Sequence, residues 1–270
     1  NRVITEPYGA SLPPERQNEF FHRYMLGVYD LYSRLTERFP DVLFESCAGG
    51  GGRNDPGMLA FAPQAWTSDD TDAVERQRIQ YGTSLVYPLV AMGAHVSAVP
   101  NHQTGRVTPL ETRAAAAFFG NLGYELDPRR LDAAEAVAVR AQIEWYKERR
   151  GLLHHGRFHR LISPFEGDGN ETAWMVVDDD ADRALVGWYR TLTLPLPGPS
   201  LLRLRGLDPE ARYRVTVWPE ADDWVVRANA LVRGGDELMQ QGLFLDDHAW
   251  ESQARGDFQA RIFELTRERA

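Results

Sequence analysis

The fold of the first half follows from residues 14–52, which read PERQNEFFHRYMLGVYDLYSRLTERFPDVLFESCAGGGG. From Phe20 onward the apolar residues recur at gaps of three and four, which predicts an amphipathic helix over residues 14–39. Pro40 ends this helix, because proline cannot continue its hydrogen bonds. Residues 41–46 then predict a short buried strand that runs into a tract of four glycines. Helix and strand therefore alternate early in the chain.

The same alternation continues to about residue 155. A turn at residues 67–70 is typical of a helix N-terminus. Helix and strand alternating at this spacing indicate a parallel sheet with crossover helices. Only about four such units fit, which is half of an eight-unit barrel. The expected elements are a strand over residues 94–99 and helices over 71–80, 110–122 and 131–150.

The pattern changes after Gly156, where short strand-like runs are separated by turns rich in glycine, proline and aspartate. Such runs without a clear helix predict an antiparallel β-sandwich. The predicted domains are therefore residues 1–155, half of a barrel, and residues 156–270, the sandwich. The expected strands are 158–162, 173–177, 185–194, 201–204, 213–217, 242–245 and 258–265.

Composition narrows the classes of partner. The chain has 270 residues, of which 43% are hydrophobic, enough for one large domain or two ordinary ones. The net charge of −9 argues against a nucleic-acid partner. The sequence has no apolar run long enough for a membrane span and no signal-peptide pattern at its start. Cys47 is the single cysteine, so an internal disulfide is excluded. A cytoplasmic location is consistent with this, and a secreted protein without disulfides is the alternative.

The glycine tract at residues 49–52 is the first candidate for chemistry. Glycines allow backbone N–H groups to approach a ligand closely. No lysine follows the tract, which excludes a phosphate-binding P-loop. A plain tight turn remains an equal alternative on composition alone.

The second candidate is Trp66 with three aspartates between positions 69 and 72. An aromatic ring beside carboxylates is typical of a sugar site, where the ring stacks on the sugar and the carboxylates do acid/base work. The residues alone favour a plainer alternative, in which the aspartates complement the dipole at a helix N-terminus. A metal site is a third alternative, but His95 and His102 do not have a tight ligand spacing.

Several longer motifs resemble family 36 glycoside hydrolases, the bacterial α-galactosidases. The resemblance covers essentially the whole chain and extends to Gly235-Asp-Glu-Leu-Met239 and Gly256-Asp-Phe-Gln259. The motifs that carry it are Glu45-Ser-Cys-Ala-Gly-Gly-Gly-Gly-Arg-Asn-Asp-Pro-Gly-Met58, Trp66-Thr-Ser-Asp-Asp-Thr-Asp72, Gln80-Tyr-Gly-Thr-Ser-Leu-Val-Tyr-Pro88, Met92-Gly-Ala-His-Val-Ser-Ala-Val-Pro-Asn-His102 and Gly120-Asn-Leu-Gly-Tyr-Glu-Leu-Asp127.

The resemblance implies the second half of a (β/α)8 barrel followed by a C-terminal antiparallel β-sandwich. It also implies a retaining α-galactosidase that releases terminal α-linked galactose from oligosaccharides such as melibiose and raffinose. Asp69 matches the family's acid/base. The nucleophile belongs to a Lys-Trp-Asp-Met-Asn-Arg motif, so it would lie two residues before Asn1. We therefore expect the isolated chain to be inactive.

Further site residues follow only from this resemblance. Asn1, Cys47, Gly49 and Gly50 look like sugar contacts, and Arg53 is a weaker match. Trp66, by contrast, is a candidate from the residues alone, since its ring beside the aspartates would stack on the sugar ring. No cofactor or metal is implied, and the full-length parent would be a homo-oligomer, with a tetramer as one form. The alternatives are a galactosyl transglycosylase that makes raffinose-type sugars, or an inactive fragment with structural or sugar-binding value.

Overall fold

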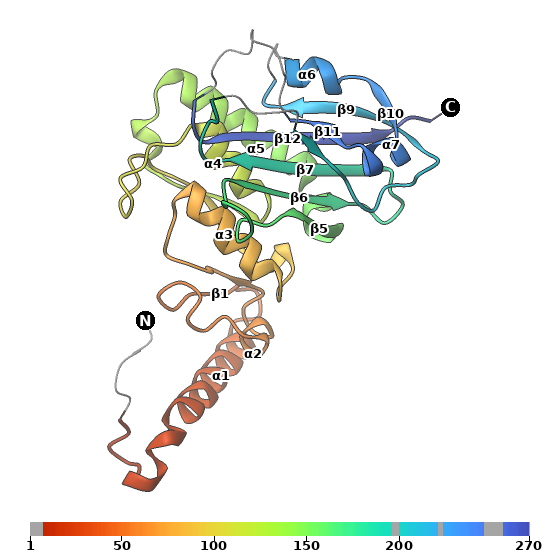
Figure 1. The fold of residues 1–270 in the computed structure, drawn as a ribbon. Helices are drawn as coiled ribbons and strands as arrows, with labels where there is room; N and C mark the ends of the chain where they lie inside the picture. Colours follow the sequence, from red (N-terminus) through yellow and green to blue (C-terminus); the bar gives the residue numbers. More distant parts are fainter. Residues whose placement is uncertain (1–7, 196–199, 221–223, 246–255, 270) are drawn as a thin grey trace. The chain divides into compact units, whose positions relative to one another are not determined.

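The computed structural model describes residues 8–195, 200–220, 224–245 and 256–269. The chain divides into two compact units (Figure 1). Unit 1 consists of Asn1–Asp70 with Ala91–Gly93, and unit 2 consists of Thr71–Val90 with Ala94–Ala270. Within the described ranges, no helix combines the length and the apolar character that a membrane crossing requires.

The long helix of unit 1 forms where its periodicity predicts. A 3-10 turn at Pro14–Glu19 leads into α1 (Phe20–Arg38), and the Phe39 N–H donates to the Leu35 carbonyl at 2.9 Å. Pro40 then follows, which confirms the predicted end of the helix. No described side chain of α1 is fully buried, but Tyr29 and Tyr32 are partly covered by Phe44 and Phe61, with ring centroids 5.9–6.5 Å apart.

The strand predicted at residues 41–46 is shorter than expected. Only β1 (Glu45–Ser46) forms, and it pairs in parallel with β2 (Gln64–Ala65). Residues 41–43 are exposed, with Leu43 at 82% exposure, and no described strand pairs with them. Between the two strands lies the short helix α2 (Pro56–Leu59), which is capped by the Asp55 side chain.

Unit 2 begins with an alternation of helix and strand. Here α3 (Ala73–Ser84) is capped by Asp72, so the prediction that the 67–70 turn caps this helix is wrong. The helix predicted over 110–122 ends earlier, because residues 121–125 form a strand beside β3. The remaining elements are β3 (Gly93–Ser97), α4 (Leu110–Phe118), β4 (Asn121–Glu125) and α5 (Ala133–His155).

The C-terminal part forms a six-stranded sheet in the order β10-β9-β12-β7-β6-β5, and its neighbouring strands pair antiparallel. Two short strands, β8 and β11, form a second antiparallel sheet. Neither short helix, α6 or α7, was expected from the sequence, and β10 was missed as well. The elements are β5 (Arg157–Ile162), β6 (Glu171–Val177), β7 (Arg183–Arg190), β8 (Leu201–Leu202), β9 (Arg212–Trp218), α6 (Trp224–Asn229), β10 (Val232–Gly234), α7 (Gly235–Gln240), β11 (Leu243–Phe244) and β12 (Gln259–Arg267).

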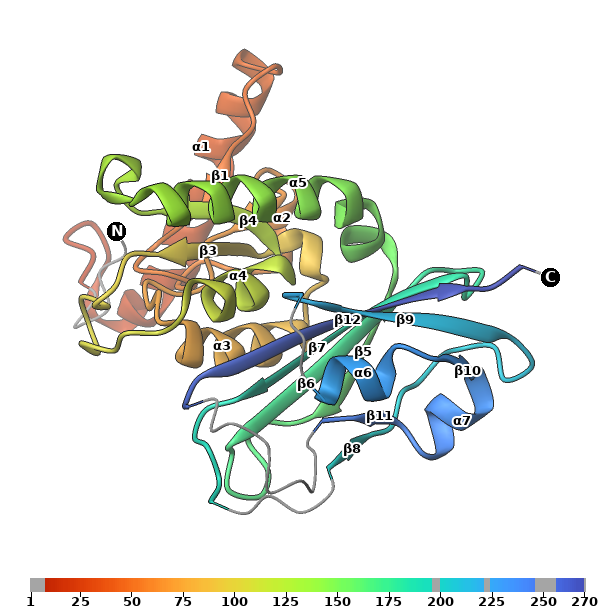
Figure 2. The same ribbon diagram turned by 90° about the horizontal axis from the view of Figure 1, so that it is seen from above.

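Both faces of this large sheet are covered. Figure 2 shows α4 and α5 on one side of the sheet, and β8, β11 and α6 on the other. Along β6 the side chains alternate accordingly, since Trp174 packs on Phe119 while Met175 joins the core with Leu202 and Leu243. The Tyr189 hydroxyl also donates to the Ala115 carbonyl at 2.7 Å. Since α4 and α5 pack on the sheet, the division into domains 1–155 and 156–270 stays a prediction.

Candidate functional site

The parallel pairing of β1 and β2 brings two candidate segments together in unit 1. Both strands end at the same edge, so the chain after Ser46 and the chain after Ala65 leave side by side. The Trp66 N–H donates to the Ser46 carbonyl at 2.9 Å and fixes this arrangement. The glycine tract and the segment that carries Asp69 therefore face one another.

The glycine tract is a tight turn whose conformation requires glycine. Gly49 and Gly50 have φ values of 57° and 72°, in the left-handed region. The Ala48 N–H donates to the Gly50 carbonyl at 3.0 Å and closes the turn. A Cβ placed on Gly50 would lie 2.7 Å from the Ser68 Cα and 2.8 Å from the Asp69 nitrogen. Only glycine therefore permits this close approach to the backbone of Asp69.

Arg53 connects the start of the glycine turn to α1 by two hydrogen bonds. Its Nη1 donates to the Tyr24 hydroxyl at 2.8 Å, and its Nη2 donates to the Cys47 carbonyl at 2.9 Å. The guanidinium thus links α1 to the first residue after β1, a geometry that its planar fork supports. Both bonds are internal, so the observed position of Arg53 supports a positioning role beside Cys47.

The predicted site residues differ in exposure. Asp69, Cys47 and Gly49 are exposed, whereas Gly50 is buried. Trp66 is only 8% exposed and lies against Gly93. Its stacking on a sugar stays a prediction. Asn1 lies outside the described residues.

The three aspartates at 69–72 do not act as one cluster. The Asp72 carboxylate accepts from the backbone N–H groups of Val74 and Glu75 at 2.9 and 3.2 Å, and it also pairs with Arg106. Asp72 is 2% exposed and belongs to unit 2. The alternative of a helix cap is thus correct for Asp72, while Asp69 stays exposed. Within the described ranges, no group of three histidine, cysteine or acidic residues could hold a metal ion.

Two supporting residues were missed by the sequence analysis. Tyr24 falls on the apolar face of the helix predicted over residues 14–39, yet its hydroxyl accepts a hydrogen bond from Arg53. Asp55 accepts from the Tyr29 hydroxyl at 2.7 Å and from the Met58 N–H at 2.9 Å, so it ties α1 to α2. An aspartate before a proline is a signal for a helix N-cap and could have identified Asp55.

Comparison with known proteins shows which family this chain resembles. Residues 1–156 match the family described as Melibiase, and residues 171–265 match the glycosyl hydrolase family 36 C-terminal domain. The α-galactosidase AgaA of Geobacillus stearothermophilus is 53% identical over 245 residues, 91% of this chain and 32% of that protein. The α-galactosidase Mel36A of Lactobacillus acidophilus is 43% identical over 263 residues, 97% of this chain and 33% of that protein. The chain thus spans about a third of the length of these relatives.

Solved structures agree with these matches. The α-galactosidase AgaB of G. stearothermophilus superimposes with a TM-score of 0.85 at 50% identity, over 98% of this chain and 34% of that one. The α-galactosidase of Lactobacillus brevis gives 0.86 at 47% identity, over 97% and 34%. These likenesses confirm the second half of a (β/α)8 barrel followed by a C-terminal antiparallel β-sandwich. The chain therefore belongs to the melibiase family of glycoside hydrolases and carries the family 36 C-terminal domain.

Proposed function

We propose that the gene product is a retaining α-galactosidase with Asp69 as its acid/base. The observation that carries the proposal is the exposed Asp69 held against Gly50 at the edge where β1 and β2 end. Active sites of (β/α)8 barrels lie at the carboxyl ends of their strands. Relatives support the substrate class, because AgaA variants were solved in complex with raffinose and with stachyose.

The proposed mechanism uses two carboxylates. One attacks the anomeric carbon of the galactosyl group while Asp69 gives its proton to the departing oxygen. Asp69 then takes a proton from water, whose oxygen attacks the galactosyl ester and releases galactose with retained configuration. We assign the attacking carboxylate to the aspartate of the Lys-Trp-Asp-Met-Asn-Arg motif, whose last two residues match Asn1 and Arg2. Retention requires the two carboxyl groups at about 5–5.5 Å.

The glycine tract would receive the sugar. The exposed turn at Gly49 and Gly50 brings backbone groups next to Asp69, and Cys47 lies beside them at the end of β1. Trp66 and Asn1 complete the proposed sugar-binding set. Arg53 would act through the turn, because its guanidinium donates hydrogen bonds to Tyr24 and to the Cys47 carbonyl.

Cys47 provides a direct probe of the sugar pocket. Its side chain is exposed, so a thiol reagent can reach it. We expect saturating galactose to slow alkylation of Cys47 severalfold in the gene product expressed from its whole reading frame. Peptide mapping by mass spectrometry measures labelling at this position alone. Glucose at the same concentration is the control, and equal labelling with galactose and glucose would place Cys47 outside the pocket.

Product analysis tests the function itself. With raffinose as substrate, the gene product should release galactose and sucrose, whereas a transglycosylase would accumulate larger oligosaccharides. Absence of both products would favour a structural or sugar-binding role. We further propose a homo-oligomer, as the family resemblance implies, and a cytoplasmic location, with which the single cysteine is consistent. Light scattering coupled to size exclusion would measure the assembly.

A further inference from the structure

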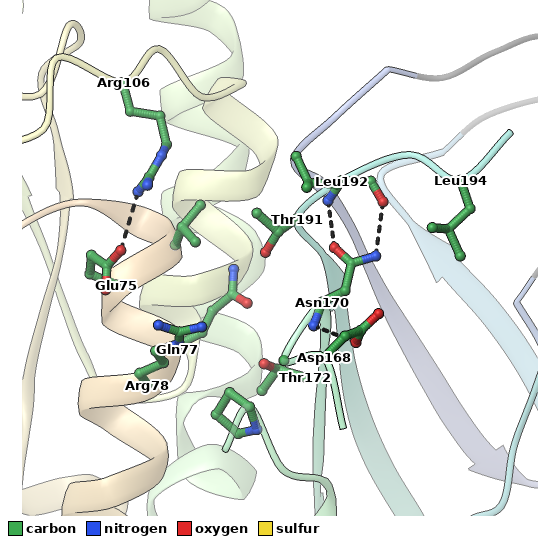
Figure 3. A pocket seen from close by; sticks show the side chains of 13 residues that line it. Glu75, Gln77, Arg78, Arg106, Asp168, Asn170, Thr172, Thr191, Leu192 and Leu194 are labelled. Atoms are coloured by element: carbon green, nitrogen blue, oxygen red, sulfur yellow. Dashed lines mark hydrogen bonds and ion pairs between the residues drawn. The ribbon is translucent and has the colours of Figure 1, made fainter. Parts of the chain in front are cut away.

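A cavity of about 390 Å³ lies within unit 2, between α3 and the loops at the ends of β6 and β7 (Figure 3). Its α3 wall includes Gln77 and Arg78, and the opposite wall includes residues 168–172 and 191–194. The volume falls within the range of about 300–1,000 Å³ in which small-molecule sites are found. The cavity shares no residue with the site around Asp69.

Gln77 is the feature that indicates a ligand. Its residue is 5% exposed, and its amide points into the cavity in Figure 3. The Gln77 side chain makes no hydrogen bond to any residue that the structure describes. Gln80, one turn later and equally buried, donates to the Ala116 carbonyl at 2.8 Å. Because the Gln77 amide faces the cavity and has no hydrogen-bond partner among the described residues, its donor and acceptor are available to a bound molecule.

The opposite wall is rigid. The Asn170 amide donates to the Leu192 carbonyl at 3.0 Å and its oxygen accepts from the Leu192 N–H at 2.7 Å. The Asp168 carboxylate accepts from the Asn170 N–H at 3.0 Å, which fixes the turn before β6. Thr172, 2% exposed, also lines the cavity. A wall held by its own hydrogen bonds needs little ordering when a ligand binds.

The charges around the cavity balance. Arg106 is paired with Asp72 and lies 3.6 Å from Glu75, so its charge is already compensated. Arg78 and Asp168 add one charge of each sign. Neither an anion nor a cation is therefore favoured. The apolar surfaces of Val74 and Leu194 complete a lining that suits a neutral ligand with both hydroxyl and C–H faces.

We propose that this cavity binds a neutral saccharide unit, with Gln77 as its central hydrogen-bonding residue. A sugar ring offers hydroxyl groups that can hydrogen-bond the Gln77 amide, and it offers an apolar C–H face that Val74 and Leu194 can cover. The inference rests on the cavity alone and goes beyond the proposed α-galactosidase activity. It therefore stands or falls separately from the role of Asp69.

Calorimetry with sucrose, a disaccharide without a galactosyl group, tests the proposal in the gene product expressed from its whole reading frame. The site around Asp69 is first saturated with 1-deoxygalactonojirimycin, the compound found in complex with an AgaA variant. We expect saturable sucrose binding under these conditions and none with glycerol. Because sucrose is also the leaving group of raffinose, only the sucrose binding that Gln77→Met weakens is assigned to the cavity. Absence of saturable sucrose binding would overturn the proposal, whether or not the enzyme hydrolyses raffinose.

The variant Gln77→Met separates binding from stability. It should weaken sucrose binding about tenfold, and it should leave the Tm unchanged or raise it, because no internal hydrogen bond is lost. Gln142→Met is the matched control: Gln142 is 2% exposed in α5 and accepts from the Tyr124 hydroxyl at 3.0 Å, so this variant should lower the Tm and keep sucrose binding. Thr172→Val should weaken binding as a second test. Unchanged affinity in Gln77→Met, or a fall in its Tm like that of the control, would refute the assignment.

Discussion

Asp69→Asn is expected to lower raffinose hydrolysis by about 10²–10⁴-fold, the usual contribution of a general acid or base. An aryl galactoside with a good leaving group needs little protonation, so its first step should survive while its second step slows for want of a base. Steady-state kinetics on both substrates, with a burst measurement on the aryl galactoside, separates the two steps.

Asp70→Asn is the matched control for this experiment. It removes one negative charge from the residue next to Asp69, and the proposed mechanism gives Asp70 no step. The Asp70 N–H donates to the Ser68 hydroxyl at 3.1 Å, a backbone contact that the substitution keeps. We expect kcat on raffinose to stay close to that of the unmodified enzyme. If Asp69→Asn hydrolyses raffinose as well as Asp70→Asn does, Asp69 is only a surface charge.

Gly50→Ala is expected to reduce kcat/KM on raffinose by about 10²-fold, because small displacements of a catalytic group cost that much. The added Cβ would lie 2.7 Å from the Ser68 Cα and 2.8 Å from the Asp69 nitrogen, so the backbone that carries Asp69 must shift. Kinetics on raffinose, with a thermal melt to measure stability, distinguishes displacement of Asp69 from unfolding.

Gly49→Ala is the matched control at the neighbouring position. Gly49 also has a positive φ of 57°, but a Cβ there would have no neighbour within 4 Å. The left-handed backbone then costs about 1–2 kcal/mol of stability without moving Asp69. Because Gly49 belongs to the proposed sugar-binding set, its variant is compared through kcat at saturating raffinose. Equal losses of kcat in the two variants would show that strain in the turn, and not the position of Asp69, limits the reaction.

Periodicity predicted the long elements well. The apolar residues of α1 recur at helical spacing, and Pro40 marks its end. Five of the six strands of the large sheet were also located, since turns rich in glycine and proline separate them, whereas β10 was missed. The short helices α6 and α7 were missed because six residues give too little periodicity to recognise.

Positions that depend on tertiary contacts could not be predicted from the sequence. Asp69 and Asp72 lie three residues apart and look alike, but Asp72 is buried because it caps α3 and pairs with Arg106. Nothing in the sequence distinguishes Gln77 from other helical glutamines. Its place in a cavity depends on the loop before β6, which forms the opposite wall. The approach of Gly50 to Asp69 likewise depends on the pairing of β1 with β2.

The most direct test of Asp69 as the acid/base is the configuration of the product that azide forms with Asp69→Asn. Azide needs no base, so it should displace the enzyme carboxylate from the galactosyl ester and restore turnover of an activated aryl galactoside. The first step converts the α-galactoside into a β-linked galactosyl ester, and attack by azide inverts the anomeric carbon again. NMR should therefore show α-galactosyl azide. Formation of β-galactosyl azide would instead make Asp69 the nucleophile and contradict the account.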